Sequence, residues 1–228
     1  NPDIDLNKFN FKTFKNYESS YCYNIQFNRK NKPNLNSSIV DKVNKNIKRL
    51  IQDKKRCTLY LRQRTGGLET TTRNGSNFEA YIPLIKYLIS KKYVIFLVGE
   101  ADWYTSQFNL DKRSVMDHKI ANIDRDLFQI YAGFNCDLFI SECGGFKFFG
   151  YYAPIAIGIN YFPYGTVEPN FVKTFHKKIK ENEKILDYEE CYKKFWHKFD
   201  FADKDPIKYK IINNSSEDIL NLIEKVNI

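Results

Sequence analysis

Long apolar runs are missing from this chain, and so are the residue clusters that usually hold metals. No segment reaches the length of a membrane span, and no signal peptide is visible. The five cysteines are widely spaced, the three histidines lie far apart, and no Cys-x-x-Cys pair marks a zinc site. We therefore expect no metal and a reduced, cytoplasmic setting, with peripheral contact at the inner face of the membrane left open.

The familiar nucleotide-binding motifs are absent as well. The sequence has no Gly-x-Gly-x-x-Gly loop, no Walker loop and no Gly-x-Ser-x-Gly elbow. Its net charge of +9 and pI near 9.1 favour a polyanionic ligand or a negatively charged surface. The lysines are nevertheless spread along the chain without an Arg-rich block, as AT-rich coding would also produce. A nucleic-acid partner is therefore disfavoured.

What the chain does have is a substantial apolar content, arranged as alternating strands and helices. Hydrophobic residues make up 43% of the 228 residues and aromatics 16%. Residues 1–38 show little periodicity and are expected to form a linker or an irregular segment. Residues 39–228 are expected to form one α/β domain, a Rossmann-like and mostly parallel sheet with helices on both faces.

The expected elements follow from apolar spacing and capping residues. The predicted strands cover residues 57–62, 93–98, 137–140, 154–160 and 209–212. The predicted helices cover residues 39–54, 78–91, 124–131, 146–152, 188–196 and 217–226. Ser37 or Ser38 is expected to cap the first helix, and Ser215 or Ser216 the last.

The Ser-Glu-Cys-Gly-Gly segment, Ser141–Gly145, stands between a strand and a predicted helix at residues 146–152. Two glycines there would leave backbone N–H groups bare at the positive end of a helix, which suits a phosphate or another anion. The alternative is a turn that merely needs glycine for positive φ.

Ligands of such sheets bind beyond the carboxyl ends of the strands. The loops expected there are residues 62–76, 99–103, 141–145 and 160–165. Arg62, Arg64 and Arg73 share the first loop, and guanidinium groups pair bidentately with phosphate oxygens. They suggest a pyrophosphate clamp, with surface ion pairs as the alternative for each arginine.

Carboxylates and aromatic rings also fall on these loops. Glu100, Asp102 or Glu142 could bind a sugar hydroxyl or act as a base, although a solvated loop carboxylate is the default for each alone. Tyr161 could stack on a base or sugar, although packing is the default in a chain this rich in aromatics. The expected substrate-binding residues are Arg73, Asn74, Gly99, Glu100, Ser141, Glu142, Cys143, Gly144, Gly145, Asn160 and Tyr161.

With these segments in order, the chain resembles the C-terminal half of a GT-B glycosyltransferase, more closely a bacterial family of glycosyltransferases found with surface-polysaccharide genes. The segments that carry the resemblance are residues 59–62, residues 73–89, residues 124–145 and residues 212–219. The resemblance implies that Arg62 and the 141–145 turn contact a nucleotide-sugar diphosphate. We expect Arg62 and Arg64 to be the catalytic residues, because they would neutralise the charge that grows on the diphosphate as the nucleotide leaves. It also implies no cofactor, a glycan acceptor and a preceding Rossmann-like domain that supplies the acceptor site and often the base.

The chain departs from the family pattern at Glu142 and Cys143, where small or hydroxyl residues are expected, and Gly-Gly replaces a glycine followed by an apolar residue. Glu142 beside a diphosphate would be repulsive unless it faces away. Two functional hypotheses follow. The first is a metal-independent sugar transferase that acts in surface glycan synthesis; the second is a catalytically degenerate domain that serves binding or assembly.

Overall fold

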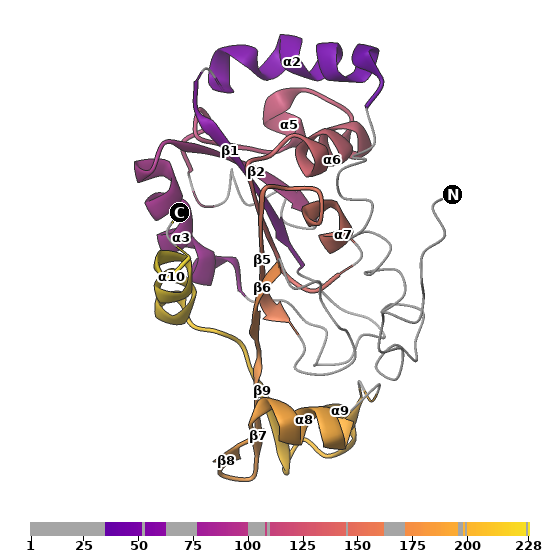
Figure 1. Ribbon diagram of the computed structural model, residues 1–228, viewed down its shortest axis with the longest axis vertical. Coiled ribbons are helices and arrows are strands. Elements are labelled where there is room, and N and C mark those ends of the chain that lie inside the picture. The colour runs from indigo at the N-terminus through magenta and orange to yellow at the C-terminus, as the bar shows by residue number, and fades with distance from the viewer. Residues whose placement is uncertain are drawn as a thin grey trace, which may run out of the picture.

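The computed structural model describes residues 35–51, 53–62, 77–99, 108, 110–144, 146–161, 172–195, 198, 200–226 and 228 (Figure 1). The strands are β1 (Lys55–Leu61), β2 (Tyr93–Gly99), β3 (Val115–Met116), β4 (Leu138–Ser141), β5 (Ile155–Tyr161), β6 (Val172–His176), β7 (Lys178–Glu181), β8 (Lys184–Ile185) and β9 (Tyr209–Ile212). The helices are α2 (Ser37–Ile51), the 3₁₀ helix η4 (Phe78–Tyr81), α3 (Ile82–Ser90), α5 (His118–Ala121), α6 (Arg125–Phe134), α7 (Lys147–Gly150), α8 (Tyr188–Phe195), α9 (Phe201–Lys204) and α10 (Ser216–Glu224).

Six strands form a parallel sheet in the order β3-β2-β1-β4-β5-β6. This is the strand order of the doubly wound Rossmann fold, and it confirms the predicted fold class. The order reverses between β1 and β4, where Cys57 lies opposite Leu138 and Tyr60 opposite Ser141. Crevices for ligands form at such reversal points because the crossover helices leave on opposite faces.

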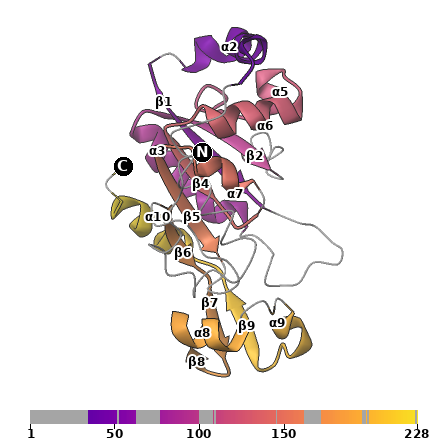
Figure 2. The ribbon, with the colours of Figure 1, turned by 45° about the vertical axis from the view of Figure 1, so that its right-hand side comes forward.

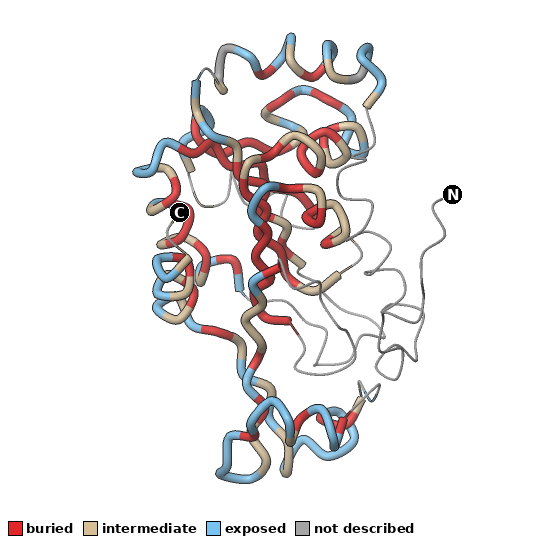
Figure 3. The backbone as a smooth tube through the Cα atoms, viewed as in Figure 1, coloured by how far each residue is buried: buried red, intermediate tan, exposed pale blue. Residues whose placement is uncertain are grey.

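Helices cover both faces of this sheet. In Figure 1, α3 and α10 lie on one side and α5, α6 and α7 on the other, with α2 across the top. The first layer packs on side chains such as Leu59, Ile95 and Ile140, and the second on Val94 and Phe96. Because β2 is buried along its whole length, its sequence has no polar alternation. Figure 3 shows the buried sheet at the centre of the molecule.

Capping residues fix several helix starts. Asn77 caps η4, and Asp124 caps α6 by accepting from the backbone N–H groups of Asp126 and Leu127. Ser215 caps α10 in a reciprocal capping box with Asp218, so Ser215 is the cap rather than Ser216. The expected serine cap of α2 is wrong: Ser37 and Ser38 lie inside the helix, and the side-chain oxygen Oδ1 of Asn36 accepts from the Ser38 backbone N–H at 3.0 Å.

A second, antiparallel sheet with the order β8-β7-β9 lies at the lower end of the molecule, together with α8 and α9 (Figure 2). The strand at residues 209–212 was predicted, but β9 pairs with β7 rather than extending the parallel sheet. We call residues 178–212 the small unit. The chain enters this unit after β6 and leaves it before α10, so two connecting segments join it to the parallel sheet. No described helix has the length and apolarity needed to cross a bilayer.

Candidate functional site at the carboxyl edge of the sheet

The ends of β1 and β4 meet at the point where the strand order reverses. The Glu142 backbone N–H donates to the Tyr60 carbonyl at 3.0 Å and continues the pairing of the two strands. Beyond this bond, the Arg62 guanidinium donates through Nη1 to the Cys143 carbonyl at 3.4 Å. The structure therefore brings Arg62 and the turn that follows β4 together on one edge, as the sequence predicted.

Glu142 faces into the protein instead of toward a ligand. Its side chain is 2% exposed and accepts hydrogen bonds from the Arg62 backbone N–H at 2.8 Å and from the Tyr81 hydroxyl at 2.8 Å. The Asn160 amide lies 3.5 Å from the same carboxylate. These contacts hold the ends of β1, β4, β5 and η4 in one place. The repulsion expected between Glu142 and a bound anion is reduced because the carboxylate is directed at internal donors.

Asn160 is the centre of the neighbouring hydrogen bonds. It sits at a β-bulge between Ile159 and Tyr161 and has a φ of +58°, a conformation that asparagine tolerates better than most residues. Its side-chain oxygen Oδ1 accepts from the backbone N–H and the side-chain amide of Asn214 at 2.7 and 2.9 Å. Its own amide donates to the Tyr81 hydroxyl at 3.3 Å. The side chain of Asn160 thus joins β5 to the segment that enters α10.

Ser141 and Tyr161 point into the layer beside α7. Their hydroxyl groups lie 2.8 Å apart, and both side chains are buried. The Lys147 ammonium lies 5.4 Å from the centre of the Tyr161 ring. The Tyr161 ring also covers Gly158, where an added Cβ would come within 2.6 Å of the ring. Among the residues predicted to bind substrate, these two are therefore packed in the protein interior.

The glycines at this edge make room for Tyr60. A Cβ on Gly144 would come 2.5 Å from the Tyr60 hydroxyl oxygen, and a Cβ on Gly99 would come 2.6 Å from the ring. Gly99 also has a φ of +86°, and its carbonyl accepts from Arg125 Nη2 at 2.7 Å. The helix expected after the glycines is much shorter than predicted, since α7 spans only Lys147–Gly150. Because one turn carries little macrodipole, the anion-binding helix start that the sequence suggested is not formed by α7.

Lys177 is the charged residue at this edge that the sequence did not single out. It follows β6 directly and is 5% exposed, and its backbone N–H donates to the Tyr161 carbonyl at 2.9 Å. Burial lowers the pKa of its ammonium to about 8, while the nearby Glu142 carboxylate opposes this shift. Arg62 also acts on Lys177 and favours its neutral form. Its position inside the run His176-Lys177-Lys178-Ile179-Lys180 gave no signal, because lysines usually lie at the surface, as the adjacent Lys178 does.

Other residues predicted for this edge lie outside the described part of the chain. They are Arg64, Arg73, Asn74, Glu100 and Gly145. The described part of the site consequently combines one arginine, one buried lysine and one buried carboxylate at the reversal point of the sheet. No family model, no curated protein and no solved structure matches this chain.

Proposed function

We propose that the carboxyl edge of the parallel sheet binds the diphosphate of a nucleotide sugar, and that the chain is the donor-binding domain of a GT-B type glycosyltransferase acting in surface glycan synthesis. The observation that carries this proposal is the placement of Arg62 and Lys177 around Glu142 at the point where the strand order reverses. Open α/β sheets bind their ligands in this crevice.

The charges of the three groups support an anionic ligand. Glu142 is already engaged by neutral donors, the Arg62 backbone N–H and the Tyr81 hydroxyl. Two cationic side chains, Arg62 and Lys177, accompany this single buried carboxylate. Among the described residues of this edge, the two cations are expected to attract phosphate oxygens, since electrostatic attraction is stronger where water is excluded.

In the proposed reaction, an acceptor oxygen forms a bond to the anomeric carbon as the bond from that carbon to the diphosphate oxygen breaks. Negative charge then grows on the leaving diphosphate, and the Arg62 guanidinium would stabilise it. The acceptor proton passes to a base that we expect on a preceding domain. The inward direction of Glu142 weakens the reason for the alternative, a degenerate binding or assembly module, because that hypothesis rested on repulsion by this carboxylate.

Calorimetric titration with UDP, GDP and their sugar derivatives tests the proposal. We expect one of them to bind, and we expect Arg62→Ala to weaken that binding by about tenfold to a hundredfold, the range for one charge-assisted contact to a phosphate. Arg113→Ala is the matched control because Arg113 is an exposed arginine far from this edge. Absence of heat with every nucleotide tested would favour the binding or assembly module instead.

A further inference from the structure

The opposite, amino edge of the parallel sheet carries a concentration of positive charge that the proposed catalytic function does not use. Three neighbouring strands, β3, β2 and β1, begin there after short turns rich in lysine and arginine. We define the basic edge as these turns together with the outer face of α2. Its cationic residues are Lys42, Lys45, Lys48, Lys54, Lys55, Arg56, Lys91, Lys92, Lys112 and Arg113.

Backbone hydrogen bonds show that the turns are adjacent. The Lys55 N–H donates to the Lys92 carbonyl at 3.2 Å, and the Ile95 N–H donates to the Ser114 carbonyl at 2.7 Å. Adjacent strands are about 4.8 Å apart, so the three turns lie within roughly 10 Å of one another. That distance is close to the Debye length of about 8 Å at physiological ionic strength, and the charges therefore act together on a ligand.

Few acidic groups offset this charge. The turns before β1, β2 and β3 hold seven cationic residues against two aspartates, Asp53 and Asp111, while Asp137 precedes the neighbouring β4 and Asp41 lies on α2. Asp137 is engaged with Arg56, whose backbone N–H donates to it at 2.8 Å. Asp111 accepts from the Ser114 hydroxyl at 2.8 Å and from the Arg113 backbone N–H at 3.1 Å. Within the described residues, none of the lysines of the basic edge takes part in an ion pair.

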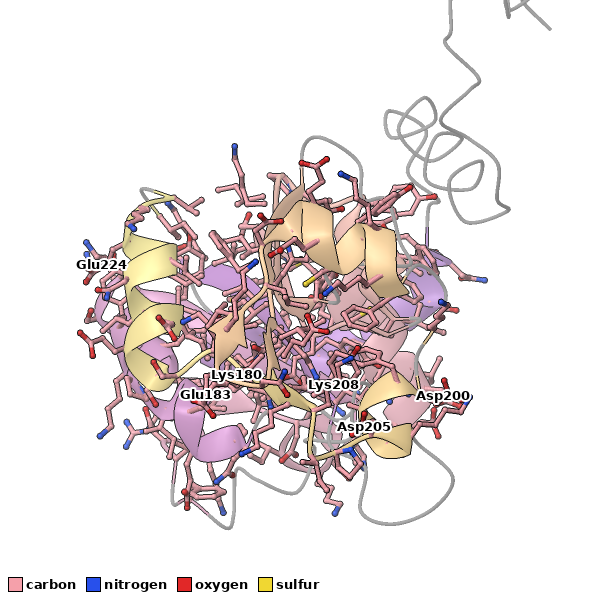
Figure 4. The ribbon with its side chains drawn as sticks, turned by 90° about the horizontal axis from the view of Figure 1, so that it is seen from below. Lys180, Glu183, Asp200, Asp205, Lys208 and Glu224 are labelled. Carbon is pink, nitrogen blue, oxygen red and sulfur yellow. The ribbon has the colours of Figure 1, made fainter. Side chains whose placement is uncertain are left out.

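The small unit shows that this imbalance is local and does not follow from a generally lysine-rich composition. Residues 178–212 contain nine lysines and eight aspartates and glutamates. Most of these lysines form ion pairs with carboxylates. Lys180 lies 2.6 Å from Glu183 and Lys204 lies 2.6 Å from Asp200. Figure 4, in which the molecule is seen from below, shows Lys180 beside Glu183 and Lys208 beside Asp205. Most lysines of the small unit are thus paired with carboxylates, whereas cations outnumber carboxylates at the basic edge.

We propose that the basic edge binds the surface of an anionic phospholipid bilayer. Its cations are mainly lysines on turns and on a helix, which suits a layer of lipid phosphates with no fixed geometry. The helix α2 does not insert, because Val43 and Ile47 on its apolar side are fully buried against the core. Contact would therefore be electrostatic and reversible.

A nucleic acid fits the same surface less well. Single-stranded nucleic acids stack their bases on exposed aromatic rings. Two rings at the basic edge already have lysine partners: the Lys55 ammonium lies 5.7 Å from the centre of the buried Tyr93 ring, and the Lys91 ammonium lies 5.3 Å from that of Tyr87. Docking on a bilayer through the amino edge would also leave the carboxyl edge, with Arg62 and Glu142, about one strand length or roughly 23 Å farther from the lipid.

Vesicle sedimentation of the full 228-residue chain tests this proposal. We expect binding to vesicles that contain about one-third phosphatidylglycerol in phosphatidylcholine, no binding to pure phosphatidylcholine, and loss of binding when salt is raised to about 0.5 M. The double substitution Lys91→Glu/Lys112→Glu should lower the partition coefficient at least about 25-fold, since each lysine near an anionic surface contributes about fivefold. The double substitution Lys42→Glu/Lys45→Glu, on the outer face of α2, should also lower the partition coefficient.

The matched control is Lys198→Glu/Lys210→Glu, which changes the net charge equally on exposed lysines of the small unit. Circular dichroism melting establishes that each variant is folded. Equal loss of binding in the control and in the two edge variants would overturn the proposal, as would absence of binding to phosphatidylglycerol at low salt. Tighter binding to a single-stranded RNA or a DNA duplex at the same salt, lost in the same edge variants, would assign the surface to nucleic acid instead. None of these outcomes depends on nucleotide binding at the carboxyl edge.

Discussion

Lys177 gives the carboxyl edge a pH dependence that can be measured. Its pKa in the free protein is lowered to about 8, mainly by burial, so the ammonium is charged below that pH. A bound diphosphate would favour the charged form and raise this pKa. The affinity for the diphosphate should therefore be highest below about pH 8 and fall about fivefold to tenfold toward pH 9.

Calorimetric titration of UDP or GDP across this pH range checks the expectation. The control is Lys177→Arg, which keeps the charge at every pH and should give a flat profile. A flat profile in the unmodified chain, despite measurable nucleotide binding, would remove Lys177 from the proposed site and leave the role of Arg62 standing.

The buried carboxylate of Glu142 should contribute strongly to stability. The two Glu142 oxygens accept separately from the Arg62 backbone N–H and the Tyr81 hydroxyl, so in Glu142→Gln an amide N–H₂ would face one of these donors, and Lys177 would lose its nearby negative charge. We expect the free energy of unfolding to fall by about 2–4 kcal/mol. Urea unfolding measures it, with Glu183→Gln in an exposed ion pair as the control. A loss as small as that of the control would mean that Glu142 is not held as described.

Single residues also show where sequence reasoning stops. Arg62 and the 141–145 turn were predicted to share an edge because both follow strands of one parallel sheet. The direction of the Glu142 side chain could not be predicted from the sequence, since it depends on a hydrogen bond from Tyr81, which lies 61 positions away in the chain. Lys177 gave no signal either: its burial follows from the chain's passage from one sheet to the other.

At the scale of elements, α10 depends on its cap. Ser215 accepts from the Asp218 backbone N–H at 3.1 Å, and the Asp218 carboxylate accepts from the Ser215 backbone N–H at 3.0 Å. Ser215→Ala should lower the free energy of unfolding by about 1 kcal/mol. Ser216→Ala, inside the first turn, should change it by less than half as much. Thermal or urea unfolding of the two variants decides between the two capping serines, and a larger loss in Ser216→Ala would contradict the structure.

The elements were predictable where apolar spacing is strong. The strand at residues 93–98 was recognised because it is apolar throughout, and the helix after Asp124 because a cap precedes an amphipathic run. The strand β6 was missed, because Lys173 is exposed and the next three residues are only half-buried. The local sequence could not predict that β9 belongs to a second sheet, since strand pairing depends on segments that are far apart in the sequence.

The two units of the molecule meet at the candidate site. The antiparallel sheet and α8 enclose a separate apolar cluster that includes Ile179, Cys191 and Phe195, and Cys143 of the turn after β4 packs against it. The two segments that connect the small unit to the parallel sheet are adjacent, because Lys178 pairs with Ile212. The small unit could therefore be replaced by a short linker without separating the strands of the parallel sheet.

That replacement predicts a change in the reactivity of Cys143. In a Cys22→Ser background, joining Lys177 to Asn213 through a short Gly-Ser linker would remove the cover from the half-buried Cys143, while Cys57 and Cys136 stay buried in the parallel-sheet unit. The rate of labelling by a soluble disulfide reagent should rise severalfold, because accessibility limits the reaction of a partly covered thiol. A Cys143→Ser version of the same shortened chain identifies the reacting thiol. If the shortened chain keeps its helix content and cooperative melting but labels no faster, then the small unit does not cover the carboxyl edge. The turn after β4 would in that case be shielded by the parallel-sheet unit alone.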